Sequence, residues 1–588
     1  MPEQMIAASL TRLRQQRTAP LILELDLTDG LTETRPADPV SAVMARHRLV
    51  LADVLDGLHR ASRDSRVRAL VVKVGGRPIG LGIVQELRQA IREFAEAGKV
   101  TVAWAESFGE FSAANVAYYL ATAFDTICLQ PSGDLGLTGL AVERIFLRGA
   151  LDKLGADFQV GKRHEYKSAA EQLTEHGFSA PAREETERMT ASVTEQLASA
   201  IAERRGLAPG QVGELIDRGP FLASQALDAG LVDTLAYRDE VYADIRQRFG
   251  STAAAAGPPA GRPPQRTEGA TLLYLTRYQR SRALAERARK LPVRRESGVA
   301  LIYATGPIRR GRSGRGPLSG GAMGSDTISA ALRTATADDQ AKAIVLRVNS
   351  PGGSYVASDT IWREVVRARA AGKPVVVSMS DVAASGGYYI AMAADVIVAQ
   401  PGTITGSIGV IMGKPVLEQA YERVGITTDS VTVGTGATMF NPAHPFTQDE
   451  WDRINTWLDA IYRDFTQKAA EGRRMPVERM HELARGRVWT GADAAANGLV
   501  DELGGMAAAA EIARRRAGLP ADAPLRVYPR LTPLDQLRPA ESSESRPAAA
   551  STFDLGFGEA WGPAWRLAAH IGLPPYGPLM LPGKWTIT

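Results

Sequence analysis

A serine placed between small residues and two glycines is the first candidate for chemistry in this chain. Ser385 stands in the stretch SDVAASGGYYIA, whose second half is typical of a helix. A serine hydroxyl is a weak nucleophile at its ordinary pKa, so covalent catalysis requires a neighbouring group that takes its proton. The same stretch could also be a plain helix N-cap, a position that serine favours. The choice depends on whether the chain offers a base.

Histidine is the first candidate for that base, but none of the seven histidines stands in a convincing partner motif. His444, in NPAHPF, lies in a Pro-containing stretch that indicates an exposed loop. Nothing in the spacing supports a Ser/His/Asp triad. Lysine is the other candidate, provided that burial lowers its pKa towards neutrality.

Lysine is scarce in this chain, because only eleven of the 69 basic residues are lysines. The segment VGKRHEYKSAAEQ of the first half carries Lys162 and Lys167. In the second half, no lysine occurs between Lys414 and Lys468. A guanidinium does not deprotonate, so a lysine in an arginine-rich chain can mark a position where arginine would not serve. Lys162 and Lys167 both qualify as the base; the alternative for each is a solvated surface side chain.

A glycine-containing turn offers the third part of a hydrolytic site. The stretch LRVNSPGGS places Gly352 and Gly353 directly after an apolar strand. Backbone N–H groups at such a turn could form an oxyanion hole for charge that develops in the transition state. Taken alone, the stretch is better explained as a plain strand-to-helix turn, and the presence of Ser385 one β-unit later favours the oxyanion hole.

Two similar halves make up the chain. The segment NVAYYLATAFDTICLQPSGDLGLTGL, from Asn115, aligns with SGGYYIAMAADVIVAQPGTITGSIGV, from Ser385, without a gap. A repeat of this length indicates a domain duplication, because solenoid repeats run to about 50 residues. In this alignment Ser385 corresponds to Asn115, and Ser407 corresponds to Leu137. Each of the two serine hydroxyls is therefore present in one half only.

Short β-branched runs such as ALVVKV and PVVVSM alternate with amphipathic stretches in both halves. This alternation predicts an α/β fold with mostly parallel sheets built from βαβ units and flanking helices. The predicted domains are an N-terminal segment (1–19), a first domain (20–249), a Pro/Gly/Ala-rich linker region (250–295), a second domain (296–520) and a Pro-rich tail (521–588). We expect most of the tail to be disordered, with a short aromatic docking segment at its end.

The composition is that of a soluble globular protein, and the net charge of +4 is spread along the chain without a basic block. We therefore expect no nucleic-acid partner.

Cys128 is the single cysteine, so no internal disulfide can form, and the apolar stretch TICLQ predicts a buried strand position for it. Neither a signal peptide nor a membrane-spanning run is evident, which predicts a cytoplasmic protein, either free or peripheral on a membrane.

Several of these stretches resemble one known family. In order and spacing, EYKSAAE, RVNSPGGS, SDVAASGGYYIA, PGTITGSIGV and GRVWTGADAAANGLVDELGG resemble signal peptide peptidase A, or protease IV, in its long tandem form. The resemblance covers about residues 20 to 520. It implies two tandem ClpP/crotonase-like domains and a Ser/Lys-dyad serine peptidase, with Ser385 as nucleophile and Lys167 as general base. Lys162 then becomes a neighbour of the base.

The resemblance also implies the remaining site residues. Ser407 matches the serine that orients the lysine amine, and Gly352 and Gly353 match the oxyanion loop. Neither a cofactor nor a metal is expected. The implied substrates are cleaved signal peptides and other short or unfolded hydrophobic chains, and the implied assembly is a homo-oligomer, with a tetramer as the candidate state. The best-known long members carry a membrane-spanning helix ahead of the first domain, whereas the Arg-containing stretch at the start of this sequence predicts at most an interfacial amphipathic helix.

Two other functions are compatible with parts of the sequence. One is a non-catalytic scaffold that binds peptides, and the other is acyl-CoA chemistry, in which two backbone amides polarise a thioester without a serine nucleophile. The presence of Ser385, Lys167 and Ser407, each in one half only, argues against both.

Overall fold

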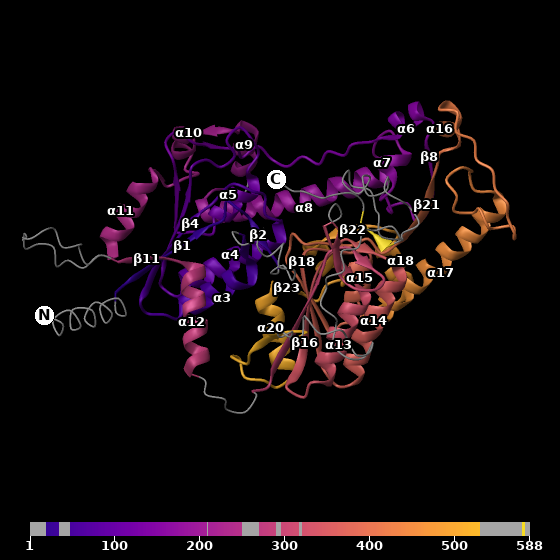
Figure 1. Cartoon of the computed structure of the whole chain (residues 1–588). Coiled ribbons are helices and arrows are strands. Elements are labelled where there is room, and N and C mark those ends of the chain that lie inside the picture. The colour runs from indigo at the N-terminus through magenta and orange to yellow at the C-terminus, as the bar shows by residue number, and fades with distance from the viewer. Residues whose placement is uncertain are drawn as a thin grey trace, which may run out of the picture. The chain divides into compact units, whose positions relative to one another are not determined.

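A computed structural model describes residues 19–33, 48–208, 210–249, 270–289, 296–316, 320–529 and 579–581. The chain forms two compact units (Figure 1). The described residues of unit 1 fall within 1–140 and 194–293, and those of unit 2 fall within 141–193 and 294–586. The segment Ala141–Val193, which the repeat pattern places in the first domain, thus belongs to the same compact unit as the second repeat.

Unit 1 is built on a six-stranded parallel sheet with the strand order β10-β6-β5-β4-β1-β11. In chain order these strands are β1 (Leu21–Asp26), β4 (Val67–Lys73), β5 (Val100–Ala105), β6 (Thr126–Leu129), β10 (Thr234–Leu235) and β11 (Thr271–Tyr274). Two short pairs lie outside the sheet, β2 (Leu31–Thr32) with β3 (Leu49–Val50), and β7 (Asp134–Leu135) with β9 (Phe221–Leu222).

The helices of unit 1 are α3 (Leu51–Ser62), α4 (Leu81–Glu96), α5 (Asn115–Ala121), α9 (Gln211–Arg218), α10 (Ala223–Asp228), α11 (Arg238–Phe249) and α12 (Leu275–Arg289). Helix α11 packs its Val241 and Ile245 against strand residues on one face of the sheet. Cys128 lies in that core, in β6, and burial raises the pKa of its thiol to about 12. The predicted buried strand position is therefore confirmed.

The structure differs from the predicted linker region in one part. Strand β11 and helix α12 fall within 250–295, and β11 pairs with β1 as the edge of the sheet. The apolar TLLY sequence explains this, because it can extend a parallel sheet as readily as the other strands do. Residues 250–269 and 290–295 lie outside the described part.

Unit 2 contains a larger, mostly parallel sheet with the order β22-β20-β18-β16-β12-β24; off this path, β19 pairs with β18 and β23 pairs with β19. The strands are β12 (Gly298–Thr305), β16 (Ala341–Ser350), β18 (Val375–Ala384), β19 (Val396–Ala399), β20 (Ile404–Gly406), β22 (Val488–Thr490), β23 (Glu502–Leu503) and β24 (Leu525–Val527). Only the β20–β22 pair in this sheet is antiparallel.

Both faces of this sheet are covered (Figure 1). Successive residues of β12 point to opposite faces, so Ala300 and Ile302 join the core that faces α13–α15, and Val299 and Leu301 join the core that faces α20. Burial on both faces explains the continuous Val/Ile runs of the sequence.

The helices of unit 2 are α6 (Arg148–Leu154), α7 (Glu171–Thr174), α13 (Ser325–Ala337), α14 (Tyr355–Ala370), α15 (Gly386–Ala391), α16 (Glu418–Arg423), α17 (Gln448–Arg473), α18 (Val477–Leu483), α19 (Gly491–Ala496) and α20 (Met506–Arg516). Helix α8 (Ala180–Arg205) continues from unit 2 into unit 1.

Two smaller sheets of unit 2 position the site. A five-stranded sheet has the order β14-β15-β13-β17-β25 and is formed by β13 (Ile308–Arg309), β14 (Gly314–Gly316), β15 (Gly320–Gly324), β17 (Gly352–Gly353) and β25 (Leu579–Met580). The second is an antiparallel pair of β8 (Asp157–Arg163) and β21 (Val410–Val416). This β8–β21 ladder joins the end of the first repeat to the second repeat.

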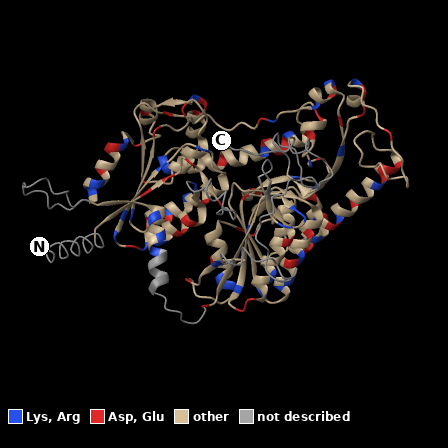
Figure 2. Ribbon diagram, in the orientation of Figure 1, with Lys and Arg blue, Asp and Glu red and all other residues tan. Residues whose placement is uncertain are grey.

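Charged residues of both signs lie side by side on the outer helices (Figure 2). No helix within the described ranges is long and apolar enough to cross a membrane. The predicted N-terminal segment and the aromatic part of the tail lie outside the described residues. The described end of the tail is the apolar segment Leu579–Leu581.

Candidate active site

Ser385 lies directly after the last residue of β18, at the carboxyl edge of the unit 2 sheet. Its amide donates a hydrogen bond to the carbonyl oxygen of Gly406 at 2.8 Å, and its own carbonyl accepts from Tyr389 in the first turn of α15. The φ angle of Ser385 is 54°, which costs a non-glycine residue about 1–3 kcal/mol. This turn between strand and helix holds the hydroxyl in a fixed, fully buried position.

The two glycines after the nucleophile candidate allow the backbone to pack closely. A Cβ at Gly387 would lie 2.6 Å from the carbonyl oxygen of Ser350, and a Cβ at Gly386 would lie 3.1 Å from the amide nitrogen of Gly353. Any side chain at these positions would push α15 away from the β16–β17 turn. The GG of ASGGYY is therefore required by this close approach.

Lys167 reaches the site by way of the β8–β21 ladder. The ladder pairs Arg163 with Val410, so the turn that follows β8 begins beside the segment that contains Ser407. Gly486 has a φ of 86°, and a Cβ there would lie 2.5 Å from the backbone nitrogen of Lys167. The glycine thus leaves space for the backbone of the lysine.

The amine of Lys167 contacts three oxygens. Its Nζ lies 2.9 Å from Ser385 Oγ, 2.9 Å from Ser407 Oγ and 3.0 Å from the carbonyl oxygen of Ser407. All three side chains are fully buried, and all belong to unit 2.

These three contacts match the valences of a neutral amine. A neutral amine has two N–H donors and one lone pair, and the carbonyl oxygen of Ser407 can only accept. If the second N–H is donated to Ser407 Oγ, the lone pair faces the hydroxyl of Ser385. In that state the Ser385 hydroxyl donates to Nζ, which is the arrangement that proton transfer requires.

Burial lowers the pKa of Lys167 to about 7, while the nearby carboxyl of Glu185 acts in the opposite direction. The amine is therefore partly neutral near pH 7, whereas an exposed lysine would be almost fully protonated. A base with a pKa close to neutrality is suited to general-base catalysis.

Glu185 is the second buried titratable group near the amine. Its Oε2 accepts a hydrogen bond from the amide of Val488 at 2.8 Å, and its Oε1 has no hydrogen-bond partner within the described ranges. Burial raises the pKa of Glu185 to about 8, opposed by the Val488 amide, by the guanidinium groups of Arg144 and Arg487, and by Lys167. At neutral pH the carboxyl is thus mostly protonated.

The glycine loop lies against the start of α15. Gly352 and Gly353 form β17, with φ angles of 100° and 152°. A Cβ on Gly352 would lie 2.7 Å from the amide nitrogen of Gly386. The amide of Gly386 stands at the first position of α15, where the helix itself provides no acceptor. The loop and this amide are close enough to stabilise one oxyanion together.

The two other candidate bases lie elsewhere in the structure. Lys162 forms an ion pair with Glu171, with Nζ and Oε1 3.2 Å apart, and is partly exposed. His444 is exposed. Neither is recorded in contact with the hydroxyl of Ser385.

Unit 1 has no equivalent of this site at the corresponding positions. Asn115 is buried, and its side chain accepts from the amides of Thr138 and Gly139 and donates to the carbonyl of Gly139. Leu137, which faces Ser407 in the repeat alignment, is a buried apolar residue. An amide that braces a loop therefore stands in place of the serine.

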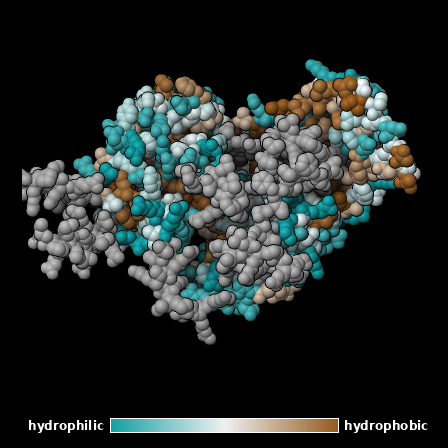
Figure 3. Space-filling view, in the orientation of Figure 1, coloured by the Kyte–Doolittle hydropathy of each residue, from teal (hydrophilic) through white to brown (hydrophobic). Residues whose placement is uncertain are grey.

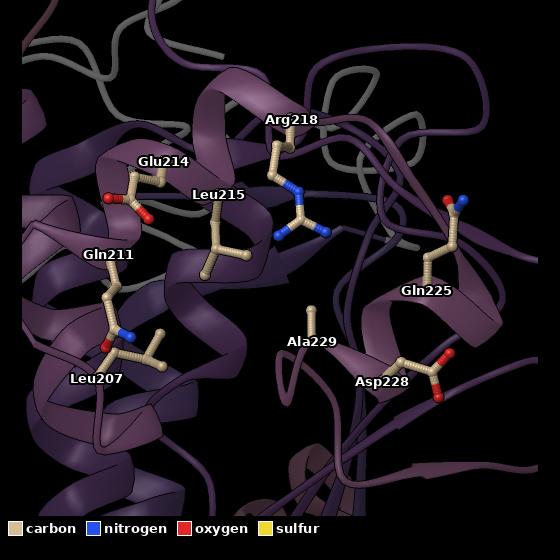
Figure 4. Close-up of a pocket in the computed structure, with 8 residues that line it drawn as sticks. All are labelled: Leu207, Gln211, Glu214, Leu215, Arg218, Gln225, Asp228 and Ala229. Carbon is tan, nitrogen blue, oxygen red and sulfur yellow. The ribbon is translucent and has the colours of Figure 1, made fainter.

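A hollow of about 370 Å³ does occur in unit 1 (Figure 4). It is lined by residues of α9, α10 and the turn after α8, among them Glu214, Arg218 and Asp228. Neither a serine, a cysteine nor a lysine lines it, so it holds no pair of a nucleophile and a base.

The site contains residues that the motifs did not single out. Glu185 follows an exposed glutamate in an acidic helix start and has no sequence feature that marks it as buried. Gly486 opens the stretch GRVWTGADAAANGLVDELGG, but its role depends on a contact with Lys167 of the other repeat, which the stretch alone does not reveal. The amide of Gly386 could have been proposed from its position directly after the serine.

The chain is similar in sequence to known families and proteins. The profile of peptidase family S49 matches residues 93–251 and 367–520, and the profile of Clp protease matches residues 322–401. A chloroplastic serine protease, SPPA, of Arabidopsis thaliana is 32% identical over 80% of the chain, which spans 66% of that protein. Protease 4 of Salmonella typhi is 32% identical over 79% of the chain, which spans 72% of it. Protease 4 of Haemophilus influenzae is 30% identical over 82% of the chain, which spans 77% of it.

The buried amine gives a prediction about stability. The folded-state pKa of Lys167 lies below its ordinary value of 10.5, so the unfolded chain binds more protons between pH 7 and 10.5. The contribution of this group to stability therefore rises with pH across that window. We expect Lys167→Met to raise the free energy of unfolding at pH 7 by about 2 kcal/mol, after the lost hydrogen bonds are subtracted.

Urea unfolding at pH 7 and at pH 9.5 measures this effect. The difference between Lys167→Met and wild type should shrink at the higher pH, and Lys162→Met should show no such change. A difference that stays constant with pH would mean that Lys167 is charged in the folded protein.

Proposed function

The chain belongs to peptidase family S49 and is a serine peptidase, and we propose that Ser385 is its nucleophile and Lys167 its general base. The prediction of this family, of its ClpP-like fold and of peptidase activity is confirmed. The family is a serine protease family involved in signal-peptide degradation. The roles of individual residues are our proposal, and the contacts of Lys167 Nζ with Ser385 and Ser407 carry it.

In the proposed reaction, neutral Lys167 takes the proton of Ser385 while Oγ attacks the carbonyl carbon of the scissile peptide bond. The carbonyl oxygen becomes an oxyanion, which the amides of the Gly352–Gly353 loop and of Gly386 stabilise. The lysine ammonium then donates its proton to the leaving amine, and an acyl-enzyme remains. Water attacks this ester with the same base, which releases the acid and restores the hydroxyl.

Ser407 is the positioning residue of this mechanism. Its hydroxyl and its carbonyl oxygen both contact Nζ, and its amide donates to the carbonyl of Arg487 at 2.6 Å. With both N–H groups of the neutral amine engaged, the lone pair has one remaining direction, towards Ser385.

We propose cleaved signal peptides and other short or unfolded hydrophobic chains as substrates. A buried nucleophile between glycine-rich strands fits an extended peptide better than a folded protein. Neither alternative function accounts for the site, because a scaffold or an acyl-CoA enzyme has no use for a lysine held neutral against a serine hydroxyl.

Self-association is part of the proposal. Apolar side chains gather at one end of unit 2, over α6, α16 and the chain after α16 (Figure 3). This apolar end comprises Ile145, Leu154, Val424, Ile426, Val431 and Val433, and each of these side chains is at least half exposed in the single chain. Because a soluble monomer seldom exposes such a patch, we propose that a second copy of the chain covers it, with a tetramer as the candidate assembly.

Replacing the base without removing its charge tests the mechanism. Lys167→Arg keeps a positive charge but cannot accept a proton at neutral pH, so kcat/KM for a peptide should fall by about 10³-fold, as in Lys167→Ala. A serine-directed fluorophosphonate should label wild type at Ser385 and leave Ser385→Ala unlabelled. Lys162→Arg, which keeps the ion pair with Glu171, is the matched control and should retain wild-type activity. If Lys167→Arg stays active, another residue is the base.

The pH profile tests whether Glu185 is protonated beside the amine. With a pKa of about 8, this carboxyl is mostly neutral at the pH where Lys167, with a pKa of about 7, loses its proton. Glu185→Gln keeps a neutral acceptor for the Val488 amide, so the acid limb of kcat/KM should stay within about 0.3 of a pH unit of its wild-type position. Glu184→Gln, at the exposed neighbouring position, should also leave the limb in place. A shift of the limb to lower pH by a full unit in Glu185→Gln alone would mean that Glu185 is ionised when Lys167 titrates.

Light scattering after size exclusion tests the association. The double substitution Val431→Asp and Val433→Asp should convert the wild-type oligomer to monomers, because it places charges in the apolar contact. Leu503→Asp, at an exposed apolar position outside the patch, should leave the oligomer intact. A monomeric wild type that binds anionic lipid vesicles through the patch would assign this surface to a membrane instead.

A further inference from the structure

The edge of the glycine loop is occupied by a distant segment of the same chain. Strand β25 pairs antiparallel with β17, so that Met580 lies opposite Gly352 and Leu579 opposite Gly353. The amide of Leu581 donates to the carbonyl of Pro351 at 2.8 Å. Because β25 is the outermost strand of its sheet, its removal would expose the edge of β17 for pairing with another extended peptide.

The three residues of this segment are almost completely buried. Leu579 is 0% exposed, Met580 6% and Leu581 3%. Leu579 belongs to the main core cluster of unit 2. Apolar burial of this extent shows a specific fit, since three residues in loose contact with a surface would retain most of their exposure.

Leu581 fills an apolar pocket beside the nucleophile. It packs in one cluster with Met189, Ala384, Ile404 and Val488. Ala384 directly precedes Ser385, and Val488 donates to Glu185 through its amide. The pocket is therefore formed by the same elements that hold the dyad.

The backbone of the segment also touches the proposed oxyanion loop. A Cβ on Gly352 would lie 2.0 Å from the carbonyl oxygen of Leu579. Only glycine at this position lets a peptide carbonyl come so close, and the amide nitrogen of Gly386 lies next to the same point. With the segment in place, both Ser385 and Lys167 have no exposed surface.

We propose that Leu579–Leu581 is an inhibitory segment that occupies the peptide-binding groove of its own chain and must leave before a substrate strand can pair with β17. The inference rests on the proposed function, because it takes the groove beside Ser385 as the place where substrates bind. Residues 530–578 tether the segment, so its local concentration does not fall on dilution, and it competes with every free peptide.

The same contacts indicate which substrates displace the segment best. A competing peptide must be extended, must pair with β17, and must place a leucine-sized apolar side chain in the Met189 pocket. A charged side chain at that position would be buried without a partner, which is strongly unfavourable. The preferred substrate class is therefore an apolar, unfolded segment.

Two variants of the full-length chain test the inference. Leu581→Asp places a charge in the apolar pocket, and a chain that ends at Pro578 lacks the segment. In both, KM for an apolar peptide should fall by about tenfold with kcat unchanged, and the rate of fluorophosphonate labelling at Ser385 should rise by a similar factor. Leu567→Asp, the same change at another leucine of the tail, should behave as wild type.

Addition of the segment in trans completes the test. A synthetic peptide with the sequence of residues 577–583 should inhibit the chain that ends at Pro578 competitively, whereas the same peptide with aspartate in place of Leu581 should not. Equal KM values and equal labelling rates in wild type and both variants would overturn the inference and leave the nucleophile proposal intact. If no form of the chain is labelled at Ser385, the proposed function fails, and the inhibitory segment fails with it.

Discussion

Burial drives the amine of Lys167 towards its neutral form, and the architecture around the site in unit 2 follows from this constraint. Desolvation lowers the pKa of Lys167 to about 7. Each unit of that shift corresponds to about 1.4 kcal/mol that the rest of the fold must supply. The hydroxyl and the carbonyl oxygen of Ser407 accept hydrogen bonds from the two N–H groups of the amine. Gly486, which has no side chain, leaves room for the backbone of Lys167. Once these are in place, the hydroxyl of Ser385 is the remaining partner of the lone pair.

The two repeats have diverged in chemistry while they kept the same sheet. In unit 1 the parallel strands and the helix after β5 are retained, but Asn115 uses its amide to hold the loop at Gly139. Leu137 makes that loop part of an apolar core. The first repeat thereby contributes the proposed base, Lys167, on a segment that belongs to unit 2.

The proposed dyad could be put forward from the sequence because its residues carry local signals. Ser385 is followed by two glycines that only a close backbone contact explains, and Lys167 is a lysine in an arginine-rich chain. The grouping of Ala141–Val193 with the second repeat was not predictable, since the pairing of β8 with β21 leaves no mark in either strand alone. The docking of Leu579–Leu581 was hidden for a related reason. Three apolar residues in a Pro-rich tail have no periodicity, and their partner is a glycine edge.

The β8–β21 ladder also fixes when the site can form during translation. Lys167 precedes Ser385 by 218 residues, so at ordinary elongation rates it leaves the ribosome about 10 to 40 seconds before the serine. Its three oxygen partners do not yet exist in that interval, and the exposed lysine carries its ordinary charge. Gly486 emerges later still. Under the proposed mechanism, a nascent chain has no activated serine until the second repeat is nearly complete, and a prematurely terminated chain is inert as a protease.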